Sequence, residues 1–482
     1  MMKKEIVLLF FPSTGPQVLE PPFGLVSLAT QLKEAGIESR IIDCRIESVP
    51  EVLKSVTKDY TILFAGLSIM TGPQITFALR LAKYLRKKGI GPLVWGGVHV
   101  SLLPEETLKH GLVDYVLKGY ADLSIVQFCK ALKGEVPLEE VEGLGFKREG
   151  RIILHPVNPN PRLDELSLPD WSLINLAPYT HTDSVFLRKK SVFLFTSRGC
   201  PFSCSFCYGS SLHEKKWQGR SYEQITQELE SLEKLTDFES VFFHDDNFSV
   251  DKERLRKVAH YLKVKKKSFV VSANLSTVSE EFVALLSECG CLRLDMAIES
   301  GSEKIRGKYQ KHFSNAQIRK VFDWSNQYKL PMLTSFIVGH PDETASDTEE
   351  TMALIDLIKS KYPLIEVIDI KVLTVYPKTL LASEVAHLGF SFPRELSKWG
   401  HFFWNTTNGP WQRKWHHDLS LVSLFAFRIH HFPPSNFFIH GLYRLLHHIS
   451  LWRWRNRFFA IPIELRALHL VLKLWGRVRI GF

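Results

Sequence analysis

Three closely spaced cysteines are the residues of this chain whose types and spacing most clearly predict chemistry. Cys200, Cys204 and Cys207 follow a short apolar run with the spacing Cys-x-x-x-Cys-x-x-Cys. Thiolates are the usual ligands of iron–sulfur clusters, and three of them can hold a cubane while leaving its fourth iron open. The loop therefore predicts a 4Fe–4S cluster whose open iron can bind a substrate or cosubstrate. A zinc site completed by His213 and a loop of free thiols are the alternatives.

The composition indicates a reducing compartment. The chain has 482 residues, of which 45% are hydrophobic and 23% charged, enough for two or three domains with ordinary cores. Its seven cysteines are too few and too unevenly placed for a disulfide framework. The first apolar run is short and lacks a signal-peptide cleavage site, and no run of about 18 apolar residues occurs. We expect a cytoplasmic protein.

Most of the net charge of +10 lies at one end of the sequence. Residues 401–482 hold eleven Lys or Arg against two acids, a net charge of +9, and six of the eleven tryptophans. Mixed cations and aromatic side chains are typical of a membrane-facing surface, of a nucleic-acid partner and of an ordinary helical cap. Composition alone leaves these three interpretations open.

Apolar strands alternate with amphipathic helices over residues 5–133. Residues 24–35 and 74–88 have helical spacing, and Gly36 and Gly89 follow them as helix stops. This alternation predicts an α/β domain with a five-stranded, doubly wound parallel sheet, whose ligand would lie beyond the carboxyl ends of the strands. The predicted strands are Ile6–Phe11, Ser39–Asp43, Thr61–Met70, Leu93–Gly97 and Asp114–Gly119.

A second strand–helix series follows a connecting region at residues 134–190. Six units of this kind can curl into an open partial barrel, in which active residues lie at the carboxyl ends of the strands. Capping-box pairs at Ser221 with Gln224, and at Ser346 with Glu349, predict two helix starts. The predicted strands are Val192–Thr196, Ser240–Asp245, Phe269–Asn274, Leu292–Glu299, Leu333–Gly339 and Val367–Val375.

The loop Arg198-Gly-Cys-Pro-Phe-Ser-Cys-Ser-Phe-Cys207 resembles that of radical S-adenosylmethionine (SAM) enzymes, including Phe206 before the last cysteine. The resemblance covers about residues 5–385. It implies that the open iron binds the amino and carboxylate groups of SAM. Reductive cleavage of SAM then gives a 5′-deoxyadenosyl radical that abstracts hydrogen from a substrate. A reductant such as flavodoxin or ferredoxin is therefore an expected partner.

The same resemblance implies SAM contacts at four strand ends. The sequences that carry it are His244-Asp-Asp-Asn-Phe248, Ile298-Glu-Ser-Gly-Ser302 and Val338-Gly-His-Pro-Asp-Glu-Thr344, with a looser match at the third strand. The implied SAM-binding residues are Phe206, Asp245, Asp246, Ser272, Asn274, Glu299, Ser300 and Gly339. A helix cap or loop acid is the alternative for either aspartate, and a structural acid is the alternative for Glu299. His340 stands where the family is usually apolar and receives no role.

The first domain resembles the cobalamin-binding modules of class B radical SAM enzymes. Pro21-Pro-Phe-Gly-Leu25, Gly66–Thr71 and Trp95–Glu105 carry this resemblance. The implied cobalamin-binding residues are Pro22, Gly24, Ser68, Thr71, Gly96, Gly97, His99 and Gly119. The chain has no Asp-x-His-x-x-Gly motif, so cobalamin would bind base-off without that ligand, and a loop histidine is the alternative for His99. Gly119-Tyr-Ala-Asp122 departs from the Gly-Glu-Gly-Glu of the family. A flavodoxin-like domain that binds nothing is the general alternative.

These patterns predict four segments. They are a cobalamin-binding domain at 1–135, a linker at 136–190, a radical SAM domain at 191–385, and a helical, basic and aromatic region at 386–482 that faces a membrane or caps the substrate. The resemblance implies methylation of an unactivated carbon in a hydrophobic substrate. Oxidative cyclisation, as in the anaerobic magnesium-protoporphyrin monomethyl ester cyclase, is the first alternative, and a non-catalytic corrinoid-binding protein is the second. We expect no nucleic-acid partner.

Overall fold

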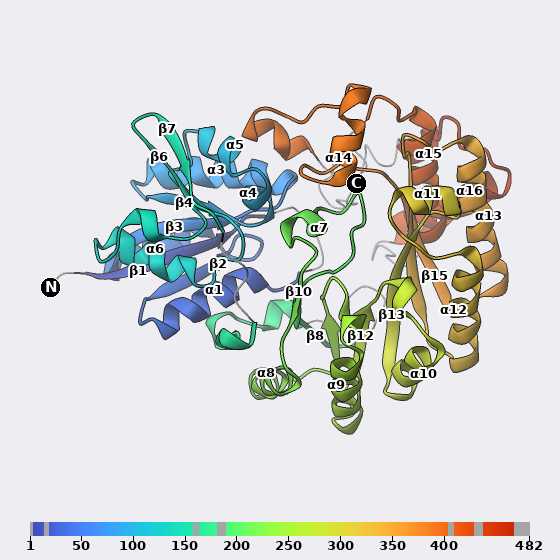
Figure 1. The fold of residues 1–482 in the computed structure, drawn as a ribbon, viewed down its shortest axis with the longest axis horizontal. Helices are drawn as coiled ribbons and strands as arrows, with labels where there is room; N and C mark the ends of the chain where they lie inside the picture. Colours follow the sequence, from blue (N-terminus) through green and yellow to red (C-terminus); the bar gives the residue numbers. More distant parts are fainter. Residues whose placement is uncertain are drawn as a thin grey trace. The chain divides into compact units, whose positions relative to one another are not determined.

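The computed structural model describes residues 3–13, 19–157, 163–180, 189–402, 409–428 and 437–466 (Figure 1). The chain divides into two compact units. Unit 1 comprises Met1–Thr180, Gln218–Asp237 and Ser391–Phe403, and unit 2 comprises His181–Trp217, Phe238–Phe390 and Trp404–Phe482. Each unit has its own largely parallel sheet.

The sheet of unit 1 has the strand order β2-β1-β3-β4-β5-β6-β7. Its first five strands pair in parallel, which confirms the predicted doubly wound domain with the flavodoxin-like order. The strands are β1 (Lys4–Phe11), β2 (Ser39–Asp43), β3 (Tyr60–Ser68), β4 (Leu93–Gly96), β5 (Tyr115–Leu117), β6 (Leu144–Arg148) and β7 (Arg151–Leu154).

Strands β6 and β7 are two more strands than the sequence predicted, and both fall in the segment expected to be a linker. They form an antiparallel hairpin that extends the sheet beyond β5. Glu149 and Gly150, which join them, both have positive φ angles of 52° and 75°. Two such residues in succession give the tight turn that matches the twist of a hairpin.

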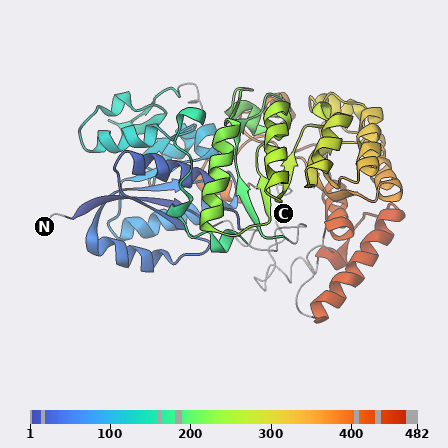
Figure 2. The same ribbon diagram turned by 90° about the horizontal axis from the view of Figure 1, so that it is seen from below.

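Helices cover both faces of this sheet (Figure 2). In α3, Ile75, Ala78, Ala82 and Leu85 are buried at intervals of three and four residues, which is the predicted helical face. The helices of unit 1 are α1 (Phe23–Glu34), α2 (Val49–Asp59), α3 (Pro73–Lys87), α4 (Val98–Leu102), α5 (Pro104–Lys109), α6 (Ser124–Leu132) and α8 (Tyr222–Leu235).

Unit 2 contains six parallel strands in the order β15-β14-β13-β12-β11-β8. This order follows the chain without closing, which confirms the partial barrel. The strands are β8 (Ser191–Leu194), β11 (Ser240–Phe243), β12 (Ser268–Ser272), β13 (Cys291–Glu299), β14 (Met332–Val338) and β15 (Ile365–Val372). The helices between and after them are α7 (Tyr208–Leu212), α9 (Lys252–Val264), α10 (Glu280–Glu288), α11 (Glu303–Lys308), α12 (Asn315–Tyr328), α13 (Ala345–Lys361) and α14 (Leu380–Val385).

One of the two predicted helix starts is correct and the other is wrong. The Ser221 side chain accepts a hydrogen bond from the Gln224 amide and caps α8. Helix α13 starts two residues earlier than predicted, because Thr344 and Asp347 form its capping box in place of Ser346 and Glu349. Both pairs fit the sequence pattern, and only the tertiary partners of Asp347 decide between them.

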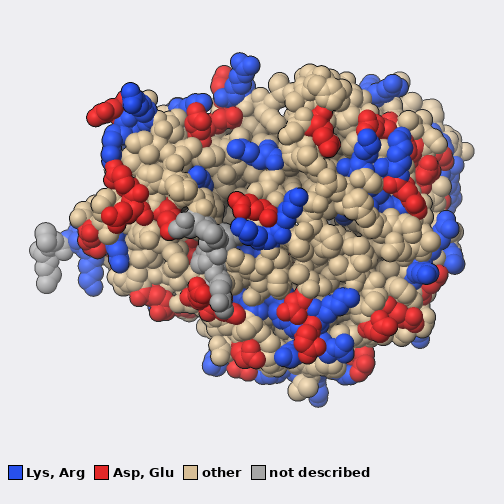
Figure 3. Space-filling model, viewed as in Figure 1, with Lys and Arg blue, Asp and Glu red and all other residues tan. Residues whose placement is uncertain are grey.

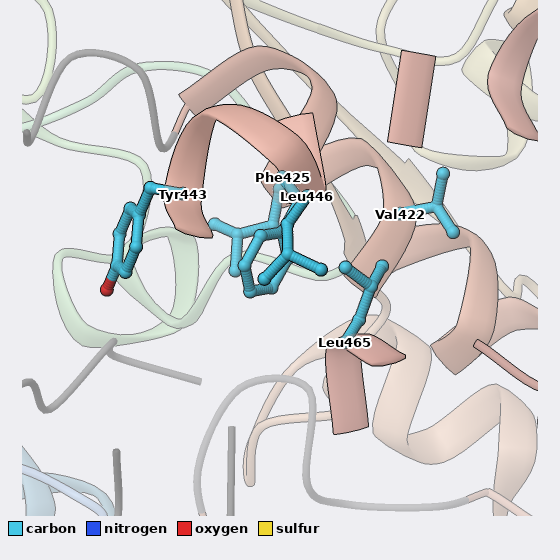
Figure 4. Packing of buried hydrophobic residues seen from close by; sticks show 6 residues of the cluster. Val422, Phe425, Tyr443, Leu446 and Leu465 are labelled. Atoms are coloured by element: carbon cyan, nitrogen blue, oxygen red, sulfur yellow. The ribbon is translucent and has the colours of Figure 1, made fainter. Parts of the chain in front are cut away.

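The C-terminal region of unit 2 is helical, as predicted, and includes α15 (Lys414–Ser423), a π-helical turn (Leu424–Arg428) and α16 (Phe437–Arg455). The amide of Ile370 in β15 donates to Ser423 Oγ at 3.0 Å, so α15 lies against the last barrel strand. Figure 4 shows Phe425 against Leu446 in a small core that also includes Leu465. Residues 467–482 of the predicted helical region lie outside the described residues.

On the face drawn in Figure 3, acidic and basic side chains are interspersed. Within the part of the chain that the structure describes, no helix has the length and hydropathy needed to cross a bilayer.

Candidate functional site

The three-cysteine loop follows β8 and is fixed by main-chain bonds to its neighbours. The Ser205 amide donates to the Tyr309 carbonyl oxygen at 3.1 Å, and Ser205 Oγ donates to that of Lys308 at 2.9 Å. The Leu381 amide in turn donates to the Ser205 carbonyl oxygen at 2.9 Å. These bonds hold the loop through Ser205, and they leave the thiols of Cys200, Cys204 and Cys207 available as ligands.

All three cysteines are partly buried, and none of them forms a disulfide. Burial raises the pKa of Cys200 to about 11 and also raises the pKa of Cys204 and Cys207. Lys311 opposes this effect at Cys204 by lowering its pKa. Without a bound cation these thiols stay protonated at neutral pH, whereas ligation requires the thiolate and releases the proton. Among the described residues, no three Cys, His, Asp or Glu side chains form a group that could hold a single metal ion.

The two aspartates after β11 differ in their surroundings. Asp245 is buried, and its carboxylate accepts hydrogen bonds from the amides and hydroxyls of Thr196 and Ser197. Those four donors lie in the segment after β8 where the cysteine loop begins, so the Asp245 carboxylate is engaged within the protein, as the loop-acid alternative expects. The side chain of Asp246 is half exposed, with Oδ2 3.6 Å from Nε2 of His213. Asp246 is therefore the carboxylate of this pair that is open to a ligand.

Glu299 ends β13 in a strained conformation beside a buried lysine. Its φ of 71° lies in the left-handed region, which costs a residue with a side chain about 1 kcal/mol or more. Lys311 Nζ pairs with Glu299 Oε1 at 2.7 Å, and both side chains are at least nine-tenths buried. Sequence reasoning missed Lys311, which lies on the loop after α11. The pair holds the Glu299 carboxylate in place and offers any ligand there both signs of charge.

The residues that follow Glu299 lock the turn onto α13. Ser300 Oγ lies 3.1 Å from Thr351 Oγ1 and accepts the Ser302 amide, so this predicted SAM-binding side chain is engaged in the turn. A Cβ at Gly301 would lie 2.3 Å from the Glu350 carbonyl oxygen, which explains the glycine. The carboxylate of Asp347 accepts from Ser302, Lys304 and Thr344. Through Ser302 and Thr344, Asp347 connects the motif that ends β13 with the motif that ends β14.

These contacts predict a pH-dependent stability. Burial alone would raise the pKa of Asp347, but hydrogen bonds from Lys304, Ser302 and Thr344 hold it well below its ordinary value. A depressed carboxyl pKa stabilises the fold above the unfolded value of about 3.9, and this stabilisation is lost as the pH falls through the folded value. We expect Asp347→Asn to lower the free energy of unfolding by about 2 kcal/mol at pH 7.

The deficit of Asp347→Asn should shrink as the pH falls below about 4. Urea denaturation of both proteins at several pH values measures it, with the exposed Asp237→Asn as the matched control. A deficit that stays constant down to the acid transition would show that Asp347 does not carry this charge-dependent stability.

The turn after β14 is held from two sides. The Gly339 and His340 amides donate to Glu343 Oε2. On the other side, Trp411 Nε1 donates to the Gly339 carbonyl oxygen at 2.9 Å, and Gln412 Nε2 donates to that of Leu373 at 2.7 Å. Gly339 has φ +91°, and a Cβ there would lie 3.3 Å from Gln412 Nε2. Trp411 and Gln412 stand in the segment outside the resemblance, so sequence reasoning missed them.

Phe206 packs within an aromatic group beside the cysteine loop. Its ring centroid lies 5.1 Å from that of Tyr309, which lies 5.2 Å from that of His340. Tyr309 Oη and His340 Nε2 are buried without a hydrogen-bond partner in the described part of the chain. Burial lowers the pKa of His340 to about 4, so its ring is neutral at pH 7. His340, to which no role was assigned from the sequence, is thus a buried residue beside the site.

Ser272 and Asn274 lie at the end of β12, as predicted. Asn274 Oδ1 accepts from the Ser276 amide at 3.0 Å and from its hydroxyl at 2.9 Å, which caps a short 3₁₀ turn. Ser272 is the last residue of β12 and is partly exposed. Of the two, Ser272 is less engaged in local structure.

In unit 1, the ends of β3 and β4, where the resemblance implies cobalamin binding, lie against each other. The Ile69 amide donates to the Gly96 carbonyl oxygen at 2.9 Å, and a Cβ at Gly97 would lie 2.6 Å from the Ile69 carbonyl oxygen. The Gly119 amide, after β5, donates to Ser101 Oγ at 2.8 Å. Glycine is thus required where these loops approach each other, and the resulting small-residue edge fits the close approach of a flat macrocycle.

His99 lies in α4 rather than on a loop, and its side chain is buried. Its Nδ1 lies 3.0 Å from Thr71 Oγ1, and its ring packs edge-on against Trp399 with centroids 5.2 Å apart. Nε2 has no partner among the described residues. Burial lowers the pKa of His99 to about 4, so it is a neutral imidazole with one nitrogen unsatisfied. Pro22 precedes α1, and Gly24 in its first turn has open space around it.

Comparison with known proteins identifies both domains. Residues 194–355 match the radical SAM superfamily, and residues 16–128 match the B12-binding domain. An uncharacterised methyltransferase of Pyrococcus horikoshii is 27% identical, over 79% of this chain and 83% of that protein. The anaerobic magnesium-protoporphyrin IX monomethyl ester cyclase of Synechocystis is 23% identical, over 72% of this chain and 70% of the cyclase. The chain spans most of both relatives.

A solved structure shares the fold. The radical SAM methyltransferase TsrM from Kitasatospora setae, determined with cobalamin and a [4Fe-4S] cluster, superposes with a TM-score of 0.68 at 17% identity, covering 80% of this chain and 78% of TsrM. The chain is therefore a radical SAM enzyme with a B12-binding domain. It belongs with the class B, cobalamin-dependent radical SAM enzymes, a group that includes methyltransferases and the cyclase, and its cofactors are a 4Fe–4S cluster, SAM and cobalamin.

Proposed function

We propose that this enzyme transfers a methyl group to an unactivated carbon of a hydrophobic small molecule. The observation that carries the proposal is the presence of a SAM-cleaving domain and a B12-binding domain in one chain. When bound, the cluster supplies the electron that cleaves SAM, and cobalamin carries the methyl group. One turnover consumes a substrate C–H, two SAM and two electrons. It yields the methylated product, S-adenosylhomocysteine, methionine and 5′-deoxyadenosine.

The chain's own residues bind and orient. In this proposal the thiolates of Cys200, Cys204 and Cys207 hold the cluster, and Phe206 packs on Tyr309 beside them. Asp246, whose carboxylate is partly exposed, is the acid best placed to accept hydrogen bonds from an ammonium group.

Two further features would position SAM. Lys311 holds the Glu299 carboxylate at the end of β13, where it can accept hydrogen bonds from the ligand. The Gly339 turn, fixed by Glu343 and Trp411, offers a rigid backbone edge to a planar base. Ser272 and Asn274 complete the proposed set at β12.

For cobalamin, we propose the loops of unit 1 that contain Pro22, Gly24, Ser68, Thr71, Gly96, Gly97, His99 and Gly119. Their small residues and tight main-chain contacts give a flat edge at the carboxyl ends of the strands. In the same proposal, residues 1–135 are the cobalamin-binding part and 191–385 the SAM-cleaving part. Residues 136–190 connect them and contribute the hairpin, and 386–482 form the C-terminal region.

The mass of the product separates methyl transfer from the alternative chemistry. We expect the reconstituted enzyme, given a reductant, trideuteriomethyl-SAM and a lipid extract, to yield a product in which one hydrogen is replaced by the labelled methyl group. Oxidative cyclisation would instead remove hydrogens and incorporate no label. A product that loses hydrogen without gaining label would replace the methyltransferase proposal with the cyclase alternative. Complete absence of 5′-deoxyadenosine would favour a non-catalytic corrinoid-binding protein.

An electron donor, a location in the cell and a membrane contact complete the proposed function. Electrons would come from a flavodoxin or ferredoxin, and the protein would work in the cytoplasm. We also propose that residues 401–482 contact the inner face of a membrane, because a hydrophobic substrate is most concentrated there.

A further inference from the structure

Helix α16 and the turn after it expose an unusual amount of apolar surface. Within the part of the chain that the structure describes, six of fifteen exposed large hydrophobic residues lie between positions 442 and 463. Their exposed fractions run from 43% to 66%. We call this set the apolar strip: Leu442, Leu445, Trp452, Phe458, Ile461 and Ile463. Isolated exposed apolar residues are ordinary, but a cluster of this kind marks an interaction surface.

Three residues of the strip lie on one side of α16, and the other three follow its end. Leu442, Leu445 and Trp452 are spaced by three and seven residues, which puts them on one face, and the ring of Trp452 lies 6.1 Å from that of Phe458. Tyr443 and Leu446 are instead buried and belong to the small core drawn in Figure 4. Figure 2 shows α16 at the periphery of unit 2. The helix thus has a separate buried face, and the strip is not part of that core.

Buried polar contacts hold the strip in shape. Arg453, which is 7% exposed, pairs with Glu464 and donates to the carbonyl oxygens of Phe458 and Ala460. Trp454 Nε1 donates to Asp356 Oδ1 on α13 at 2.7 Å. The turn is therefore fixed against the end of α16, and α16 is fixed against α13. A preformed surface loses little conformational entropy when it binds.

Beside the strip, Arg457 pairs with Glu349 and Asp356, and the charges left outside ion pairs on α16 are positive. Arg444 and Arg455 are exposed on α16 and form no ion pair in the described part of the chain. Glu464 is the only acid in residues 437–466, and Arg453 already neutralises it. A second copy of this chain would bring the same arginines together in a twofold contact, which repels. A bilayer with anionic head groups has an apolar interior behind a negatively charged surface. It therefore matches both the apolar strip and the two arginines.

We propose that the apolar strip, with Arg444 and Arg455, is the surface by which this enzyme binds an anionic lipid bilayer. The strip enters the interface while the two arginines meet lipid phosphates. This inference rests on the proposed function for its purpose, access to a hydrophobic substrate, but its test needs no catalysis.

The test is flotation of the full-length, reconstituted protein with phosphatidylcholine vesicles, with and without phosphatidylglycerol. We expect strong binding only with the anionic lipid. Leu445→Glu with Trp452→Glu should abolish flotation, whereas Val264→Glu, a substitution at an apolar residue that is 81% exposed on α9, should not. Arg444→Gln with Arg455→Gln should weaken partitioning about five-fold per arginine. Arg319→Gln with Lys320→Gln, an exposed pair on α12, should have little effect.

Equal flotation of the wild type and the strip variant, or equal flotation on neutral vesicles, would overturn the proposal. So would a dimer in lipid-free solution that dissociates on Trp452→Glu, because a second copy would then cover the strip. Measuring 5′-deoxyadenosine on the same samples separates the two claims. Cleavage of SAM without flotation refutes only the membrane surface, and flotation without cleavage refutes only the proposed function.

Discussion

Replacing Cys204 by alanine is expected to remove the cluster and with it all SAM cleavage. A cubane held by three thiolates cannot spare one of them, so bound iron and sulfide should fall to background. Formation of 5′-deoxyadenosine should fall at least about a thousand-fold. The fold should survive, because Ser205, and not the thiols, ties the loop to Tyr309 and Lys308. Iron and sulfide analysis after anaerobic reconstitution measures the first effect, and chromatography of the nucleoside measures the second.

Two companion variants make this result specific. Cys44→Ala changes a partly buried cysteine of unit 1 and should leave the iron content unchanged. His213→Ala tests the zinc alternative, which requires that histidine as fourth ligand. Loss of a bound metal in His213→Ala, or full iron retention in Cys204→Ala, would contradict a three-cysteine cluster.

Replacing Gly97 by alanine is expected to abolish cobalamin binding while leaving the cluster intact. The added Cβ would lie 2.6 Å from the carbonyl oxygen and 2.8 Å from the amide nitrogen of Ile69, and these backbone atoms cannot swing aside. Gly97 also has φ +93°, which favours glycine. The ends of β3 and β4 must therefore separate, which we expect to lower the stability of unit 1 by about 3 kcal/mol. Cobalt analysis after incubation with hydroxocobalamin provides the readout.

Gly89→Ala is the matched control for Gly97→Ala. Gly89 has φ +71° but nothing within 4 Å of a new Cβ, so its substitution brings backbone strain without a clash. It should retain cobalt and lose about 1 kcal/mol of stability. Unchanged cobalt in Gly97→Ala would remove β3 and β4 from the cobalamin site. Loss of iron together with cobalt would indicate general unfolding instead of a local effect.

Much of the fold could be predicted because local pattern and tertiary structure agree. The buried face of α3 and the five parallel strands of unit 1 follow directly from apolar periodicity. The hairpin β6–β7 was missed because its Glu149-Gly150 turn lacks the Asn-Gly or Asp-Gly signature. Local sequence patterns thus predict the strands and helices whose flanking turns have a common sequence signature.

The site was harder to predict, because its residues come together from distant positions. Trp411 bonds to Gly339 across 72 residues, and no local pattern in the sequence pairs them. Lys311 reads as an ordinary loop lysine until the fold places it on Glu299. Asp245 and Asp246 are neighbours in a loop, where periodicity does not tell which carboxylate turns inward. The motifs therefore predict the position of the site, and the structure distinguishes side chains engaged within the protein from those open to a ligand.

The central claim is that this chain uses SAM in two ways, once at a cluster and once through cobalamin. Its most direct test is to measure separately two nucleoside products, 5′-deoxyadenosine and S-adenosylhomocysteine, from reconstituted enzyme given SAM and a reductant. We predict that both form in the loaded wild type. Cys204→Ala should form no 5′-deoxyadenosine, and enzyme without cobalamin should form no S-adenosylhomocysteine. S-adenosylhomocysteine at the same rate with and without cobalamin, or no 5′-deoxyadenosine from the loaded enzyme, would contradict the claim.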